Sequence, residues 1–205
     1  MSSDEKVLIL GIGNVLWADE GFGVRAVEAL HRRCVFPHHV TVMDGGTQGL
    51  YLLPHVRDCS VLIILDAVDY GLPAGTLKLV GDEKVPSYMG AKKVSLHQAG
   101  FQEVLATATL LGWEPRRVLL VGVQPSIIED YGGSLTRLVA SKIDAAVSEV
   151  LAELGRLGIE VSERCFLADD LGPAALDQAA YEQGRPAAEL ACRIGDDRFL
   201  DGLRG

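Results

Sequence analysis

The fold of this chain is decided by the stretch Val7-Leu8-Ile9-Leu10-Gly11-Ile12-Gly13-Asn14-Val15-Leu16-Trp17-Ala18-Asp19-Glu20-Gly21-Phe22-Gly23. Its apolar start predicts a buried strand, and the glycines that follow predict a tight loop before a helix. Such a loop usually cradles phosphate with backbone N–H groups. Here Asp19 and Glu20 stand at the helix start, and Leu16 replaces the third glycine of the dinucleotide fingerprint. Since both carboxylates would repel a pyrophosphate, the loop is expected to face a cation.

Composition and charge limit the class of protein. The 205 residues, 48% of them hydrophobic, suffice for one sizeable core. The net charge is -9, and lysines and arginines form no run longer than a pair. This charge argues against nucleic acid and against an anionic membrane as the main partner. The polar N-terminus precedes an apolar run too short for a signal peptide or membrane span, so we expect a cytoplasmic protein.

Four cysteines are scattered along the chain without a Cys-x-x-Cys pair: Cys34, Cys59, Cys165 and Cys192. This spacing indicates neither a disulfide framework nor a zinc knuckle. We therefore interpret the cysteines as small apolar filler.

Short apolar runs alternate with helical patterns over about the first 160 residues. Strands are predicted at 7–10, 40–43, 61–65 and 118–123, with a weaker edge strand at 76–80. Apolar residues spaced three and four apart predict helices around 24–30 and 101–111. This alternation predicts an α/β fold in three layers, with a mostly parallel twisted sheet and helices on both faces. Residues 1–160 are predicted to form a single domain.

The longest predicted helix begins near Ser134, a suitable N-cap, and ends at Leu157 before Gly158. Residues 161–205 form an acidic, Ala- and Gly-rich C-terminal extension, which we do not regard as an independent domain. Weak helices at 174–180 and 187–192 packing on the core are one interpretation. A loosely ordered extension is the other.

Polar residues follow each predicted strand at the edge where open α/β sheets gather ligands. They include Glu20 after the first strand, Asp44 after the second, Asp66 at the end of the third, and His97 in a later loop. Each has an ordinary explanation, since Glu20 and Asp66 can favour or cap a helix start and Asp44 can form a turn. Their convergence on one edge favours a functional site.

A metal site is one function that these residues suit. Glu20, Asp66 and His97 offer two carboxylates and one imidazole, with coordination positions left open, which suits nickel or zinc. His97 is the histidine expected at a loop that opens a helix, where a backbone hydrogen bond is the alternative role. A ligand set with vacant positions would bind a further molecule.

These motifs together resemble the hydrogenase maturation proteases, which trim the C-terminal extension from the large subunit of nickel-iron hydrogenases. The matching segments are Gly11-Ile12-Gly13-Asn14 with Asp19-Glu20-Gly21 and Gly23-Val24, Asp44-Gly45-Gly46-Thr47, Asp66-Ala67, Ser95-Leu96-His97-Gln98 and Val121-Gly122-Val123-Gln124-Pro125. They cover about the first three quarters of the chain. The combination is specific, although the glycine loop alone is a weak signal.

The resemblance implies an endopeptidase whose partner is the immature nickel-iron hydrogenase large subunit. It implies that Glu20, Asp66 and His97 contact nickel supplied by that substrate and not tightly bound in the free enzyme. Asp44 would be a further functional carboxylate. The sequence contains no Gly-x-Ser-x-Gly elbow and no His-Glu-x-x-His helix, so water is expected to be the nucleophile. Either nickel or a carboxylate such as Asp44 could activate it.

Two other classes stay open at this point. A non-catalytic nickel-handling or docking protein for hydrogenase assembly would use the same three ligands. A nucleotide-binding enzyme is favoured by the Gly-x-Gly loop but opposed by Asp19, Glu20 and the lack of a Walker lysine. An α/β hydrolase acting on peptidyl-RNA also has a Gly-x-Gly-Asn strand end, and the acidic charge opposes it.

Overall fold

A five-stranded sheet forms the centre of the molecule. The computed structural model describes residues 5–85, 96–128, 130–166 and 171–184. The strands lie in the order β3-β1-β4-β6-β5, and only β5 at the edge runs antiparallel to its neighbour. Their bounds are β1 Val7–Ile12, β3 Val40–Gly46, β4 Val61–Ala67, β5 Leu77–Gly81 and β6 Arg117–Val123. All five predicted strands and the predicted α/β class are confirmed.

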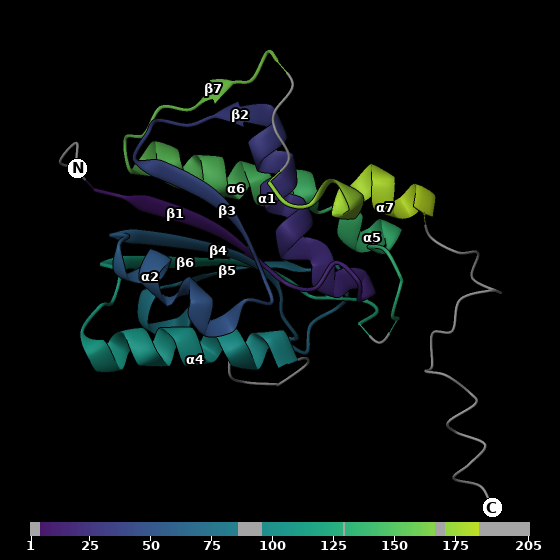
Figure 1. The fold of residues 1–205 in the computed structure, drawn as a ribbon, viewed down its shortest axis with the longest axis horizontal. Helices are drawn as coiled ribbons and strands as arrows, with labels where there is room; N and C mark the ends of the chain where they lie inside the picture. The colour runs from purple at the N-terminus through teal and green to yellow at the C-terminus, as the bar shows by residue number, and fades with distance from the viewer. Residues whose placement is uncertain (1–4, 86–95, 129, 167–170, 185–205) are drawn as a thin grey trace, which may run out of the picture.

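Helices cover both faces of the sheet (Figure 1). On one face lie α1 and α6, and on the other lie α2 and α4. Val7 and Ile9 of β1 face the first pair, whereas Leu8 and Leu10 face the second. This alternation explains the uninterrupted apolar runs, because a central parallel strand is buried on both sides. The helix bounds are α1 Phe22–Arg33, α2 Leu53–Arg57, α4 Leu96–Leu111 and α6 Ile143–Arg156, with short 3-10 turns η2 Gly49–Leu52 and η3 Asp82–Lys84.

The long helix predicted from Ser134 to Leu157 is two helices, α5 Arg137–Ala140 and α6, separated by a turn. The N-cap of α5 is Thr136, whose side chain accepts a hydrogen bond from the backbone N–H of Val139. Ser134 instead donates to Glu182, 2.7 Å away. The predicted start was wrong because Asp19 fixes the backbone of Thr136, a contact between distant segments that helical spacing does not reveal.

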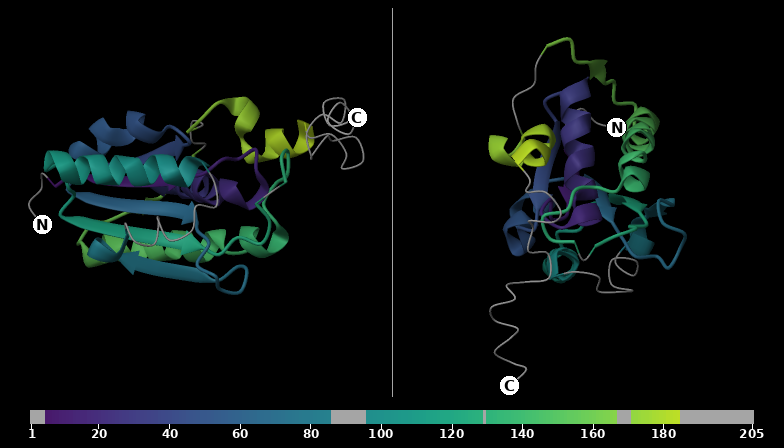
Figure 2. Two further views of the ribbon diagram at one scale, coloured as in Figure 1. Left: turned by 90° about the horizontal axis from the view of Figure 1, so that it is seen from below. Right: turned by 90° about the vertical axis from the view of Figure 1, so that its right-hand side faces the viewer.

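Part of the C-terminal extension is ordered against α1. Short strands β2 Cys34–Val35 and β7 Ser162–Glu163 pair antiparallel, and Arg164 donates to the carbonyls of His31 and Cys34. Further on, η4 Ala174–Leu176 and α7 Gln178–Gly184 lie beside α1, which Figure 2 shows between α7 and α6. Of the two predicted weak helices, the first is therefore present. The second, at 187–192, lies outside the described residues.

Cys34 and Cys59 are buried, as predicted for apolar filler, but Cys165 is exposed and that prediction was wrong for it. Cys192 lies outside the described residues. None of the helices described has both the length and the apolar character that a membrane span requires.

Candidate active site

The predicted site residues of β3 and β4 lie one strand to either side of β1. Gly11 near the end of β1 is paired with Asp44 of β3 on one side and with Leu65 of β4 on the other. Asp66 follows directly, so both carboxylates occupy the carboxyl edge of the sheet. This is the edge at which open α/β sheets place their sites.

Glu20 is brought to the same edge by the loop after β1. It belongs to the 3-10 turn η1 (Ala18–Gly21), which contacts β4 and leads into α1. A Cβ on Gly23 would lie 2.1 Å from the carbonyl oxygen of Leu65 and 2.3 Å from that of Ile12. Only glycine permits this approach, which presses the start of α1 against the ends of β4 and β1. Glu20 is 7% exposed there, and Asp66 is fully buried.

Asp19, the neighbour of Glu20, has a structural role. Its fully buried carboxylate accepts hydrogen bonds from the backbone N–H groups of Ser126 and Ile127, both at 2.9 Å, and of Thr136 at 2.7 Å. The Thr136 hydroxyl donates a fourth bond at 3.1 Å. The expectation that both loop carboxylates face a cation was therefore wrong for Asp19, whose oxygens are engaged by protein donors. It fastens the loop after β6 to the loop that carries Glu20.

Asp44 sits in a glycine turn and is half-buried. The backbone N–H of Gly46, which has a positive φ of 44°, donates to its Oδ1 at 2.8 Å. Burial raises the pKa of Asp44 above its usual range, against the lowering effects of this hydrogen bond and of the Arg25 charge. A carboxylate with a raised pKa is a better proton acceptor near neutral pH. The turn former and the functional carboxylate are therefore compatible roles for one residue.

Arg25 and Glu28 of α1 lie near Asp44, and the sequence did not predict them as part of the site. Arg25 is only 3% exposed, and its Nη1 lies 3.0 and 3.1 Å from the two carboxylate oxygens of Glu28. Burial raises the pKa of Glu28, the Arg25 charge opposes that shift, and the nearby Asp44 charge adds to it. The only available signal was an Arg–Glu pair at helical spacing, which is usually a surface feature. Here it places a buried cation beside Asp44.

His97 lies in the first turn of α4, but its side chain is outside the part of the molecule that the structure describes. Ser95 of the same motif is also outside it. Among the described side chains no cluster of three metal-ligating residues occurs. The predicted ligand set of Glu20, Asp66 and His97 therefore stays a prediction. The structure places Glu20 and Asp66 at one edge of the sheet.

Comparison with known proteins decides the family. The family model described as hydrogenase maturation protease matches residues 24–153, more than half of the chain. This chain belongs to the hydrogenase maturation protease family. The resemblance seen in the motifs is thereby confirmed, and the protein is a hydrolase of the endopeptidase class. The nucleotide-binding and peptidyl-RNA alternatives are excluded by this assignment.

The protease is similar both to relatives that align with nearly all of it and to shorter relatives. It is 55% identical to the hydrogenase expression/formation protein HupD of Rhodobacter capsulatus, over 96% of this chain and 93% of that protein. It is 41% identical to the hydrogenase 2 maturation protease of Escherichia coli, over 78% of this chain and 96% of that one. The solved hydrogenase maturating endopeptidase HybD of Escherichia coli superposes with a TM-score of 0.73, at 39% identity, over 78% and 98% of the two chains.

Gln124 of the protease joins two loops at the same edge of the sheet. Its Oε1 accepts hydrogen bonds from the backbone N–H groups of Tyr70 at 2.8 Å and Leu72 at 3.2 Å, and its Nε2 donates to Asp69 at 3.0 Å. The motif that contains Gln124 was expected from the resemblance, without a role for this residue. The structure shows that it ties the loop after β6 to the loop after β4, next to Asp66.

Proposed function

We propose that this protease removes the C-terminal extension from the large-subunit precursor of a nickel-iron hydrogenase after nickel has been inserted. The family and the printed names of the relatives support a substrate within hydrogenase maturation. The observation that carries the proposal is the arrangement of Asp44 and Asp66 on the strands flanking β1, with Glu20 in the turn against β4. Such a set of carboxylates suits both metal contact and proton transfer.

In this proposal nickel is part of the substrate. Glu20, Asp66 and His97 recognise a nickel ion that is already bound by precursor cysteines. Two oxygens and one nitrogen leave coordination positions open, and nickel's affinity for thiolates favours their supply by the precursor. Cleavage then depends on nickel loading, and the free protease carries little tightly bound nickel.

Asp44 acts on the peptide side of the same site. Its carboxylate accepts a proton from the attacking water or holds the peptide in position. The raised pKa of Asp44, caused by burial, supports the first role, because general bases work best when their pKa is near the working pH. The positive charge of Arg25 opposes this rise in the pKa of Asp44 and so favours its ionised form.

The test is to incubate the purified full-length chain with nickel-loaded and nickel-free precursor and to measure intact masses. We expect one shortened large subunit from loaded precursor alone. Asp44→Asn should give almost no product, whereas Asp58→Asn, a change in an exposed pair with Arg57, should cut normally. Efficient cutting of nickel-free precursor would refute the loading dependence. Binding of loaded precursor without cleavage would instead support the docking alternative.

A second arm addresses the ligands directly. Metal analysis of the free protease should find nickel well below one ion per chain. His97→Ala should weaken binding to loaded precursor and leave binding to nickel-free precursor unchanged. A stoichiometric zinc ion required for cleavage would indicate a conventional metalloprotease and contradict the proposal.

A further inference from the structure

Residues 171–184 of the C-terminal extension, here named the strap, lie over the surface next to Asp44. A pocket at this place is lined from one side by Asp44, Glu28 and Val24 and from the other by strap residues Leu171, Gly172, Pro173 and Leu176. Gly172 is so close that a Cβ on it would be 3.3 Å from Oδ2 of Asp44. The strap therefore takes up space that a peptide would need in order to reach this carboxylate.

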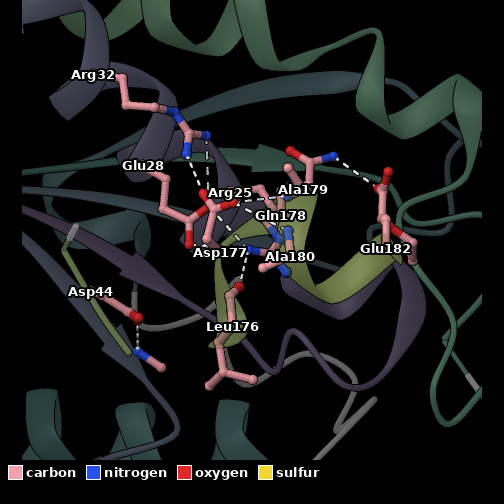
Figure 3. Close-up of polar contacts among 12 residues, drawn as sticks. Arg25, Glu28, Arg32, Asp44, Leu176, Asp177, Gln178, Ala179, Ala180 and Glu182 are labelled. Carbon is pink, nitrogen blue, oxygen red and sulfur yellow. Dashed lines mark hydrogen bonds and ion pairs between the residues drawn. The ribbon is translucent and has the colours of Figure 1, made fainter. Parts of the chain in front are cut away.

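The strap is fastened to α1 by two arginines, as Figure 3 shows. Nη1 of Arg25 donates to the main-chain carbonyl of Leu176 at 2.6 Å, and Nη1 of Arg32 lies 2.9 Å from Oδ2 of Asp177. Two further hydrogen bonds reach the loop before α5, one from the Tyr181 hydroxyl to the carbonyl of Gly133 and one from the Ser134 hydroxyl to Glu182. All four contacts are polar, and the two that involve Arg32 and Ser134 are exposed to solvent.

Apolar packing of the strap on the core comes from Leu171, which is only partly buried. No described residue of α7 is buried, and the Arg32–Asp177 pair is partly exposed. Exposed ion pairs stabilise a contact only slightly, so the strap can leave without disturbing the core. Arg25 would stay in place, because Glu28 holds it. Its contact with the strap is to a main-chain carbonyl, a group that every peptide carries.

We propose that the strap is an internal occupant of the peptide-binding surface beside Asp44, and that the substrate's C-terminal peptide must displace it. The Arg32–Asp177 ion pair is the latch. When the strap has left, the Arg25 guanidinium can hold a main-chain carbonyl of the substrate where it held that of Leu176. This inference rests on the proposed function for the identity of the peptide, but the covering of Asp44 is independent of it.

The extension also fits the pattern of relatives. The HupD relative aligns with 96% of this chain, whereas the shorter Escherichia coli protease aligns with 78% of it. In the free protease the strap would lower the apparent affinity for substrate to the intrinsic affinity multiplied by the fraction of molecules in the open state.

The latch can be weakened from both sides with a matched control. Asp177→Asn removes the charge that faces Arg32 but keeps the Oδ1 atom that accepts bonds from the N–H groups of Ala179 and Ala180. Arg32→Gln removes the other half. Arg33→Gln is the control, because the adjacent Arg33 makes a similar 2.6 Å pair with Asp144 of α6, away from the strap.

Three measurements on the full-length variants test whether the strap covers Asp44 and whether the substrate displaces it. Carbodiimide labelling of Asp44, read by peptide mass spectrometry, reports whether the carboxylate is covered. Hydrogen exchange of residues 176–184 reports opening of the strap. Steady-state cleavage of nickel-loaded precursor reports KM and kcat. Both latch variants should increase labelling and exchange about two- to fivefold, the range for a partly exposed ion pair, and lower KM by a similar factor with kcat unchanged.

The control Arg33→Gln should match the wild type in all three measurements. Unchanged Asp44 labelling in both latch variants would overturn the covering of Asp44. Increased labelling with unchanged KM would overturn the displacement by substrate. If the wild type cleaves no precursor, the proposed function fails, and labelling alone still decides whether the strap covers Asp44.

Discussion

Replacing Asp19 by asparagine should destabilise the protein strongly, although the change keeps the size of the side chain. Asp19 is an acceptor for four donors, three of them backbone N–H groups and one the Thr136 hydroxyl. Asparagine has one oxygen, which can replace Oδ2 and serve Ser126, Ile127 and the hydroxyl. Its NH2 group would then face the N–H of Thr136, a donor against a donor.

The cost can be worked from these contacts. A buried donor left without an acceptor costs about 1–3 kcal/mol, and hydrogen bonds lose roughly half of their strength when the acceptor loses its charge. We therefore expect the free energy of unfolding to fall by about 3 kcal/mol or more. In a chain of this size, that lowers Tm by roughly 6–12 °C.

The assay is urea and thermal unfolding followed by circular dichroism, with Glu20→Gln as the control. Glu20 is the adjacent carboxylate with the proposed substrate role, so its variant should lose cleavage activity to a greater extent than stability. Asp19→Asn should show the opposite order. A fully stable Asp19→Asn protein would refute the structural role of Asp19.

Three further outcomes follow from the geometry of single residues. Gly23→Ala should lower stability by about 2 kcal/mol or more, because its Cβ would meet backbone oxygens that cannot rotate away. The control Gly155→Ala, in α6 with nothing within 4 Å, should instead raise Tm slightly. Burial raises the pKa of Asp44, so its ionisation above that pKa opposes folding, and Asp44→Asn should unfold at the same or higher urea concentration at pH 7. If Asp44 is the general base, wild-type cleavage should fall on acidification at a higher pH than for an ordinary aspartate, which a pH–rate profile checks.

The strands and main helices were predictable because their signal is local. β1, β4 and β6 are dominated by Val, Ile and Leu, because strands inside a parallel sheet are buried on both faces. β3 lies at the edge of the sheet and includes Thr41 and Met43 between its valines and Asp44, yet it was still found from its valines. The pair of β2 and β7 has two residues in each strand, too short for any periodicity. The start of α5 depends on Thr136, whose backbone is held by a residue 117 positions earlier.

The candidate site was predictable only in part, because some of its residues are buried by segments that lie far away in the sequence. Strand ends identify Asp44 and Asp66, because every parallel strand delivers its carboxyl end to one edge. Arg25 could not be found, since helical spacing treats it as half of an exposed pair with Glu28. Its burial comes from Leu176 and Tyr181, which are more than 150 residues later in the chain.

Asp19 and Glu20 show why neighbouring acids in such a loop cannot be assigned from sequence. Both precede α1 and both are buried, yet the donors that occupy Asp19 come from the loop after β6. The glycines around them have a steric explanation of the same kind. Gly13 adopts a positive φ of 139° against the carbonyl of Glu20, and Gly23 lies against two strand ends. A glycine pattern that suggests a phosphate loop here permits backbone to pack on backbone, which brings Glu20 to the edge where Asp66 lies.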